Sequence, residues 1–180
     1  SLDQELAAYP QPGLASPIDS GSHQDMDASL FFRSLFSLRR YFCEITLAGQ
    51  NGASFQSLKQ LGIAAELRML KATQGINTHR GAIFNLGLLA AADGHLQHND
   101  LSLQRDALGV VVRPRWGAAI TVHCASLPNA SHGSMVAPRY RVGGALPDAS
   151  SGSTHMFCVA LPSLHKILFL VDGPYCCVFP

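Results

Sequence analysis

Two carboxylates and an imidazole lie within five residues in the segment 21–27, which reads Gly-Ser-His-Gln-Asp-Met-Asp. Asp25 and Asp27 are two residues apart, so a non-helical turn would direct both side chains toward one cation. Mg²⁺ prefers one or two carboxylates together with substrate phosphates. The segment therefore predicts a Mg²⁺ site on these two residues. The alternative is that acids at the start of a helix interact favourably with its dipole and do nothing else.

A second polar segment, 75–81, reads Gly-Ile-Asn-Thr-His-Arg-Gly and precedes a strongly apolar stretch. Thr78 can cap the helix expected there, which puts His79 and Arg80 in its first turn. Cations at this position oppose the helix dipole unless an anion is bound, and the exposed N–H groups of a helix start are suited to phosphate. The residues predicted to bind phosphate are Asn77, Thr78, His79, Arg80 and Gly81. The alternative is a polar loop whose arginine reaches solvent.

Two further groups have functional and ordinary interpretations. Glu66 lies in a helical stretch between apolar neighbours, where a carboxylate is a candidate for chemistry, and the alternative is an exposed ion pair with Arg68 or Lys71. The Ser-His-Gly segment 131–133 is weaker, because a lone histidine of this kind is more often structural than catalytic. No nucleophile elbow occurs, so a Ser-His-Asp triad is not expected.

The composition argues against several classes of protein. The 180 residues include 13 Lys+Arg and 12 Asp+Glu, and the net charge of +1 argues against a strongly basic nucleic-acid binder. Scattered aromatic residues form no stacking platform for nucleic acid. Hydrophobic residues make up 47%, enough for a sizeable core, whereas charged residues make up only 14% and become scarce after Ala145.

The cysteines and the chain's apolar stretches predict a cytoplasmic protein. Five cysteines without a CxxC pair indicate reduced thiols, each most simply a small buried hydrophobe, and not a disulfide framework or zinc cluster. No basic segment followed by an apolar one marks a secretory signal. The longest apolar stretch, 156–171, is interrupted by polar residues and falls short of the ~20 apolar residues that span a bilayer. We therefore expect no membrane span.

The spacing of apolar residues predicts that helices position these segments. Apolar side chains recur at three- and four-residue steps, and the helices so predicted span about 25–47, 54–72 and 79–92. Ser22 and Ser54 are predicted to cap the first two. The third is apolar nearly all round, which is typical of a central, buried helix. Gly49, Asn51 and Gly52 are expected to end the first helix and the pair Asp93-Gly94 the third, because glycine and asparagine are common just past a helix C-terminus.

The remaining chain continues in weaker helical patterns. Pro114 and Pro128 separate them, and they span about 99–112, 115–126 and 130–140. Because no strand alternation occurs in this stretch, we predict an all-α fold, a single multi-helix, bundle-like domain. The last segment, from Ile167 onward, has a strand-like or irregular pattern.

Four blocks of sequence, taken together, resemble one known family. They are Pro10–Leu14, Ser20–Asp27, Ala65–Met69 and Ala72–Phe84, with fainter similarity through Ser131–Gly133 and Arg139-Tyr140 to about Leu164. The most specific are the Gly-Ser-His-Gln-Asp-Met-Asp block and the Asn-Thr-His-Arg-Gly-Ala-Ile-Phe block, in this order. The chain resembles the triphosphoribosyl-dephospho-coenzyme A synthases, which serve citrate lyase and malonate decarboxylase.

The resemblance implies an all-helical transferase that acts on ATP and 3′-dephospho-CoA. Adenine leaves ATP, and the triphosphoribosyl group is joined through C1′ to the 2′-hydroxyl of 3′-dephospho-CoA. The product is the precursor of the prosthetic group on the acyl carrier subunit of citrate lyase or malonate decarboxylase. The resemblance implies neither a nucleic acid nor a membrane as partner.

Roles for the candidate residues follow when the resemblance is combined with their chemistry. We expect the segment Asn77–Arg80 to bind the triphosphate, and Asp25 and Asp27 to bind Mg²⁺ as the cofactor. One carboxylate, Glu66 or an aspartate such as Asp27, would act as base toward the attacking hydroxyl or stabilise the cationic centre. His23 would protonate the leaving adenine.

The resemblance also sets expectations for the two ends of the domain. Gln11 stands where the family usually has Lys, and Arg80 stands where it has another Lys. Family members continue well past Leu164, so we expect a synthase-like domain over 1–165, incomplete at its C-terminus, and an atypical apolar tail over 166–180. Two alternatives to a working transferase stay open. One is a truncated, inactive nucleotide-binding remnant, and the other is a helical interaction subunit.

Overall fold

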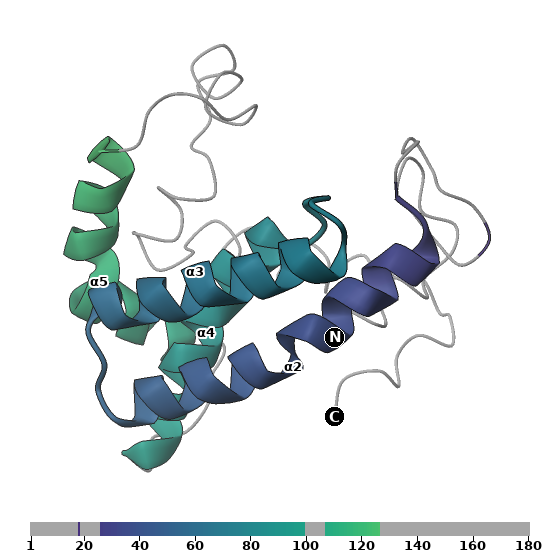
Figure 1. The fold of residues 1–180 in the computed structure, drawn as a ribbon. Coiled ribbons are helices and arrows are strands. Elements are labelled where there is room, and N and C mark those ends of the chain that lie inside the picture. Colours follow the sequence, from purple (N-terminus) through teal and green to yellow (C-terminus); the bar gives the residue numbers. More distant parts are fainter. Residues whose placement is uncertain (1–17, 19–25, 100–106, 127–180) are drawn as a thin grey trace, which may run out of the picture. The chain divides into compact units, whose positions relative to one another are not determined.

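The computed structural model describes residue 18, residues 26–99 and residues 107–126. It contains four helices in these parts of the chain, and they are α2 (Ala28–Gln50), α3 (Phe55–Ala72), α4 (Arg80–His98) and α5 (Ala107–Ser126) (Figure 1). No strand occurs among the described residues, which confirms the predicted all-α fold for them. Helices α2 to α4 belong to one compact unit and α5 to a second, which begins at Asn99.

Helix α2 packs against both α3 and α4, and these two also contact each other. Its inward face repeats at three- and four-residue steps, as the apolar pattern predicts. The buried residues of this face are Leu30, Ser34, Leu38, Tyr41, Ile45 and Gly49. Each of the three helices contacts the other two and α2 makes the most extensive contacts, so the prediction that α4 is the central helix is not confirmed.

Glycines make the contact between α2 and α4 unusually close. A Cβ on Gly49 would overlap the carbonyl oxygen of Ala91, and a Cβ on Gly94 would overlap the carbonyl oxygen of Thr46. The first helix ends at Asn51, one of the residues predicted to end it, since α2 continues to Gln50 and Asn51 is its C-cap, but Gly49 lies within the helix. The prediction that Asp93-Gly94 ends the third helix is wrong, because α4 continues to His98. Both glycines lie inside helices, where they let two backbones touch.

The helix starts agree only partly with the predicted caps. Helix α3 begins after Ser54, whose side-chain oxygen accepts a hydrogen bond from the Ser57 N–H at 3.2 Å, so this predicted cap is confirmed. Helix α2 begins after Asp27 and not at residue 25, and the Asp27 carboxylate is its cap. The cap predicted at Ser22 lies outside the described residues.

The two helices expected on either side of Pro114 form one helix, α5. A proline removes one backbone hydrogen bond and crowds the preceding turn, which is why a break was predicted. Val112, Trp116 and Ile120 follow at four-residue steps across the proline and are at most 2% exposed. This continuous buried face keeps both halves in one helix, so the predicted break is wrong.

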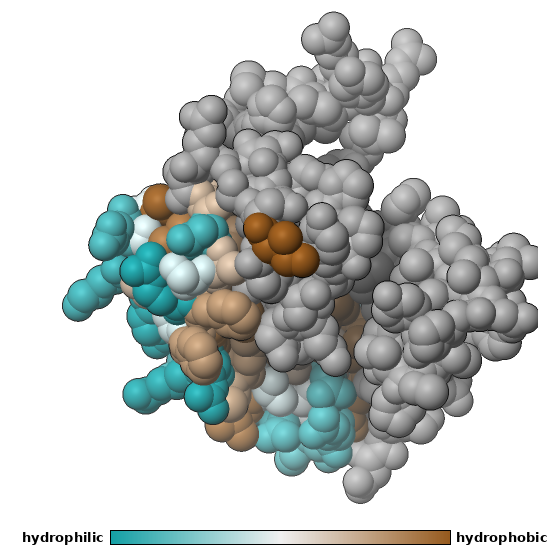
Figure 2. Space-filling view, turned by 90° about the vertical axis from the view of Figure 1, so that its right-hand side faces the viewer, coloured by the Kyte–Doolittle hydropathy of each residue, from teal (hydrophilic) through white to brown (hydrophobic). Residues whose placement is uncertain are grey.

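The surface of the described part mixes apolar and hydrophilic side chains (Figure 2). Cys43 is a free thiol and is exposed, so the expectation that it is buried is wrong. Within the described part, no helix is long and apolar enough to cross a membrane. The expected helix over 130–140, the domain boundary at 165 and the strand-like tail lie outside the described residues.

Replacing Gly49 with alanine should lower the free energy of unfolding by ~1–3 kcal/mol. The added methyl group meets the backbone of α4, which cannot rotate aside as a side chain can. Urea denaturation measures the change. Gly62→Ala is the matched control, because a Cβ there lies 3.8 Å from Ile83 Cγ2, an ordinary contact, and alanine favours the helix. An equal loss of stability in both variants would contradict the close α2–α4 contact.

Candidate functional site

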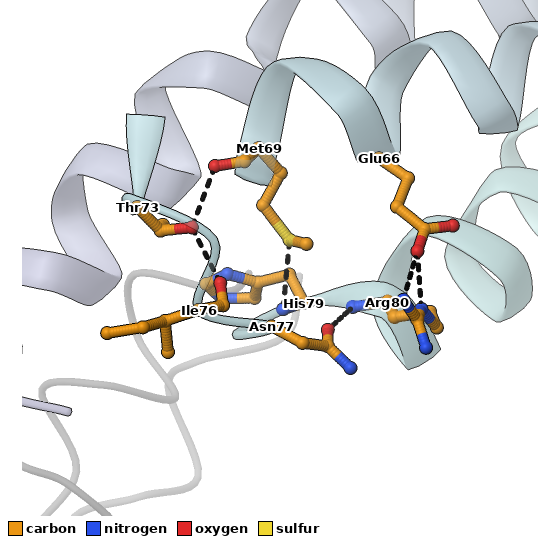
Figure 3. A network of polar contacts seen from close by, with 7 residues as sticks. All are labelled: Glu66, Met69, Thr73, Ile76, Asn77, His79 and Arg80. Carbon is orange, nitrogen blue, oxygen red and sulfur yellow. Dashed lines mark hydrogen bonds and ion pairs between the residues drawn. The ribbon is translucent and has the colours of Figure 1, made fainter. Parts of the chain in front are cut away.

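The loop between α3 and α4 holds the predicted phosphate segment in a defined conformation (Figure 3). The buried Thr73 hydroxyl lies 2.9 Å from the Met69 carbonyl oxygen and 2.6 Å from that of Ile76, so it ties the loop to the last turn of α3. The chain reverses through Gln74 and Gly75, with φ of 56° and 91°. Glycine adopts this left-handed conformation without strain, and it turns the segment that follows back toward α2 and α3.

Helix α4 is capped by a residue different from the one predicted. The side-chain oxygen of Asn77 accepts a hydrogen bond from the Arg80 N–H at 3.1 Å, and asparagine is among the preferred helix caps. Thr78 was predicted in this role, and its hydroxyl instead donates to Ser34 Oγ on α2 at 2.6 Å. The prediction for Thr78 is wrong because its acceptor lies on another helix, far away in the sequence, and local patterns do not indicate it.

His79 is buried between helices and is not a cation facing solvent. Its ring Nδ1 lies 2.6 Å from Ser34 Oγ, and its ring meets that of Phe31 edge-on at 5.3 Å between centroids. Its backbone N–H donates to Met69 Sδ at 3.2 Å. Burial lowers the pKa of His79 below its ordinary value of 6.5, so the ring is uncharged at neutral pH. The expectation of two cations in this turn is therefore corrected to one.

That one cation, Arg80, is paired with Glu66 of α3 (Figure 3). The Arg80 Nε donates to Glu66 Oε1 at 2.5 Å, and Nη2 contacts the same oxygen. The ordinary interpretation of Glu66 named the wrong partners, since Arg68 bonds to Glu44 on α2 at 3.3 Å. The fold thus brings two separately predicted candidates, a carboxylate and the phosphate segment, into contact.

The Glu66–Arg80 pair is accessible to a ligand. The Arg80 side chain is 60% exposed and that of Glu66 28% exposed. Ion pairs at such exposed positions are worth about 0–1 kcal/mol, so a stronger anion can take the guanidinium from the carboxylate. Arg80 is therefore able to exchange the Glu66 carboxylate for a bound anion.

Of the acidic segment, the described residues include Asp27. Its Oδ1 accepts hydrogen bonds from the Leu30 N–H at 2.7 Å and from the Ser29 hydroxyl at 3.0 Å. These bonds, that from Leu30 foremost, hold the pKa of the Asp27 carboxyl below its ordinary range, so it is ionised. His23 and Asp25 lie outside the described residues, among which no group of three His, Cys, Asp or Glu side chains could hold a metal ion.

Ser34 is the site residue that sequence reasoning missed. It is fully buried, and it bonds to both Thr78 and His79. The available signal was a serine at four-residue spacing between Leu30 and Leu38, on a helix face that is otherwise apolar. A polar residue in such a position needs a buried hydrogen-bond partner, although the sequence does not say which one.

Comparison with known proteins agrees with the resemblance seen in the sequence. A sequence model of the family described as ATP:dephospho-CoA triphosphoribosyl transferase matches residues 1–170. A probable 2-(5″-triphosphoribosyl)-3′-dephosphocoenzyme-A synthase of Acinetobacter calcoaceticus is 41% identical over 167 residues, which cover 93% of this chain and 57% of the relative. A protein of Lactiplantibacillus plantarum with the same description is 32% identical over 178 residues, covering 92% and 62%. No solved structure matches the chain significantly.

These matches identify the class of protein as a transferase family. It belongs to the ATP:dephospho-CoA triphosphoribosyl transferase family. The chain spans 57% and 62% of the length of the two relatives named above.

The buried His79 predicts a specific dependence of stability on pH. The unfolded chain binds a proton near the ordinary pKa of 6.5, whereas the folded chain binds it only at lower pH. Between these two values the unfolded state takes up more protons, so the free energy of unfolding should fall as pH decreases below about 6.5. Urea denaturation at a series of pH values from neutral downward measures this slope.

His79→Asn should flatten that slope, because asparagine can keep an acceptor near Ser34 without titrating. The control is His98→Asn, an exposed histidine at the end of α4, which should keep the slope of the parent chain. A slope unchanged in His79→Asn would show that His79 is not the group responsible.

Proposed function

We propose that this protein transfers the triphosphoribosyl group of ATP onto the 2′-hydroxyl of 3′-dephospho-CoA and releases adenine. Family membership supports the reaction class, and the relatives' names specify the product. The observation that carries the proposal is the contact between Glu66 and Arg80. It joins a carboxylate to a helix start that has features suited to phosphate.

The start of α4 has the properties of a triphosphate site. Neither the Gly81 nor the Ala82 amide donates a hydrogen bond to another described residue. A Cβ on Gly81 would meet nothing within 4 Å, so phosphate oxygens can approach this backbone closely. Amides at a helix start favour phosphate, and Arg80 can add a two-pronged, charge-assisted contact.

Exchange of the ion pair would supply the base. When the triphosphate binds Arg80, the Glu66 carboxylate loses its partner and becomes free to accept a proton. The bond from C1′ to adenine breaks, positive charge develops at C1′, and the 2′-hydroxyl oxygen of 3′-dephospho-CoA attacks there. Its proton passes to Glu66, and we propose that His23 protonates the leaving adenine. A base of this kind contributes roughly 10²–10⁴-fold to the rate.

Asp27 has the chemistry of a Mg²⁺ ligand. It is exposed and ionised, and the hydrogen bonds from the Leu30 N–H and the Ser29 hydroxyl both reach Oδ1. We propose that Asp25 and Asp27 hold Mg²⁺ beside the phosphates of ATP. The ion would neutralise part of the triphosphate charge. We also propose that the protein acts in the cytoplasm. Its product would be passed toward the acyl carrier subunit of citrate lyase or malonate decarboxylase.

Adenine release tests the proposed reaction directly. The purified chain, incubated with ATP, Mg²⁺ and 3′-dephospho-CoA, should release one adenine for each triphosphoribosyl product formed. Liquid chromatography of both compounds measures the ratio. ATP binding without adenine would support a nucleotide-binding remnant instead. Absence of both binding and release would favour a helical interaction subunit.

Glu66→Gln should reduce the rate of adenine release by ~10²–10⁴-fold, because glutamine cannot accept the proton. Stability should change little, since the partner of Glu66, Arg80, is 60% exposed and an ion pair with such a side chain is worth about 0–1 kcal/mol. Glu44→Gln is the matched control, because Glu44 forms ion pairs with Arg40 and Arg68 and has none with Arg80 among the described residues. The rate of this control should equal that of the parent chain. Equal rates in both variants would remove Glu66 from the mechanism.

A further inference from the structure

The buried hydroxyl of Ser34 connects α2 to the start of α4 through two short contacts. Thr78 Oγ1 donates to Ser34 Oγ at 2.6 Å, and Ser34 Oγ lies 2.6 Å from His79 Nδ1. Ser34 is 0% exposed and His79 8% exposed, so bulk water does not accept hydrogen bonds from these side chains. Each proton therefore needs an acceptor inside the protein.

Counting protons and lone pairs decides which ring nitrogen carries hydrogen. A serine hydroxyl has one proton to donate and two lone pairs that accept, and the Thr78 hydroxyl uses one lone pair of Ser34. Among the described contacts of Ser34 Oγ, His79 Nδ1 is the acceptor for the remaining proton. With hydrogen on Nδ1, the ring would donate to Ser34 instead, and the buried Ser34 proton would lose that acceptor. His79 Nδ1 also lies 3.2 Å from Thr78 Oγ1, and this longer contact carries no hydrogen when Nδ1 is unprotonated. Hydrogen on Nε2 nevertheless satisfies both short contacts and the buried Ser34 proton, whereas hydrogen on Nδ1 leaves that proton without an acceptor among the described residues.

We propose that Ser34 and Thr78 are positioning residues that hold His79 as a neutral imidazole with its hydrogen on Nε2. The ring then offers the proposed nucleotide an N–H donor and no positive charge. The identity of this ligand rests on the proposed function, whereas the position of the hydrogen does not.

The surroundings of His79 favour this neutral donor over an imidazolium. The described residues that form hydrogen bonds or a ring contact with it carry no charge, and they are Phe31, Ser34, Met69 and Thr78. A positive ring at the start of α4 would be opposed by the helix dipole. Arg80, the next residue, already supplies the positive charge and is balanced by Glu66 in the free protein. His79 thus adds hydrogen bonding to the site without adding charge.

Nuclear magnetic resonance of the ¹⁵N-labelled chain of 180 residues tests the assignment. Long-range ¹H–¹⁵N spectra at pH 7 distinguish the two neutral forms of histidine from the charged form, and His79→Asn identifies the signals. We expect an unprotonated Nδ1 and a protonated Nε2 in the parent chain. Inorganic triphosphate with Mg²⁺ should shift the Nε2 signal and leave Nδ1 unprotonated.

Variants separate the positioning role from a general loss of structure. Ser34→Ala should allow hydrogen on either nitrogen, so that the two neutral forms mix. Ser37→Ala is the control on the same helix, because the Ser37 hydroxyl bonds a backbone carbonyl and not the ring. Thr78→Val should weaken the preference and Thr78→Ser should restore it. If Ser34→Ala does not fold, the parent spectrum and the Thr78 pair still decide the question.

The spectroscopic outcomes can be distinguished from those of the adenine-release test of the proposed reaction. Hydrogen on Nδ1, a charged ring at pH 7, or protonation of the ring by bound triphosphate would each overturn the inference. An Nε2 signal that does not respond to triphosphate would overturn its role toward the nucleotide. Absence of adenine release with the expected hydrogen position would instead count against the proposed function alone.

Discussion

The close approach of α2 and α4 is the constraint on which the rest of the described unit depends. Gly49 and Gly94 each replace a side chain with backbone contact, and Gly87 makes room for the Tyr41 hydroxyl, which donates to the Ile83 carbonyl at 2.7 Å. Because the helices touch at these points, their relative position is fixed within the size of a methyl group. The start of α4 is thereby held beside Ser34, and the packing of the helices determines the geometry of the candidate site.

The loop that precedes α4 also helps to fix the start of this helix. Thr73 and Gly75 fix how the chain leaves α3, and Asn77 fixes how it enters α4. Met69 contacts the backbone of His79 from α3, while Ser34 contacts its ring from α2. A histidine held at backbone and ring by two different helices has little freedom to reorient. Orientation of this kind, set before a ligand arrives, is what a binding site requires.

The sequence predicted the helices of this unit well because their apolar residues repeat with the helical period, and local periodicity survives in any helical packing. The same reasoning found the end of α2 at Asn51 but misplaced that of α4 at Gly94, since a glycine that ends a helix and one that contacts another helix look alike in sequence. The phosphate segment was recognised from its residue types. The partners Ser34 for His79 and Glu66 for Arg80 were not, because these pairs are 45 and 14 residues apart and only the fold brings them together.

The pairing of Arg80 with Glu66 also has a consequence for selectivity. In the free protein the guanidinium is already neutralised, so an anion that binds it must displace a carboxylate. Chloride or another singly charged ion gains nothing by this exchange, whereas a polyphosphate brings several charges and several acceptor oxygens at once. Under the proposed function, Glu66 would compete with the ligand for Arg80, at a cost to binding of about 0–1 kcal/mol for an exposed pair. A cost of this size would weigh more on a single-contact anion than on a ligand that makes several contacts at once.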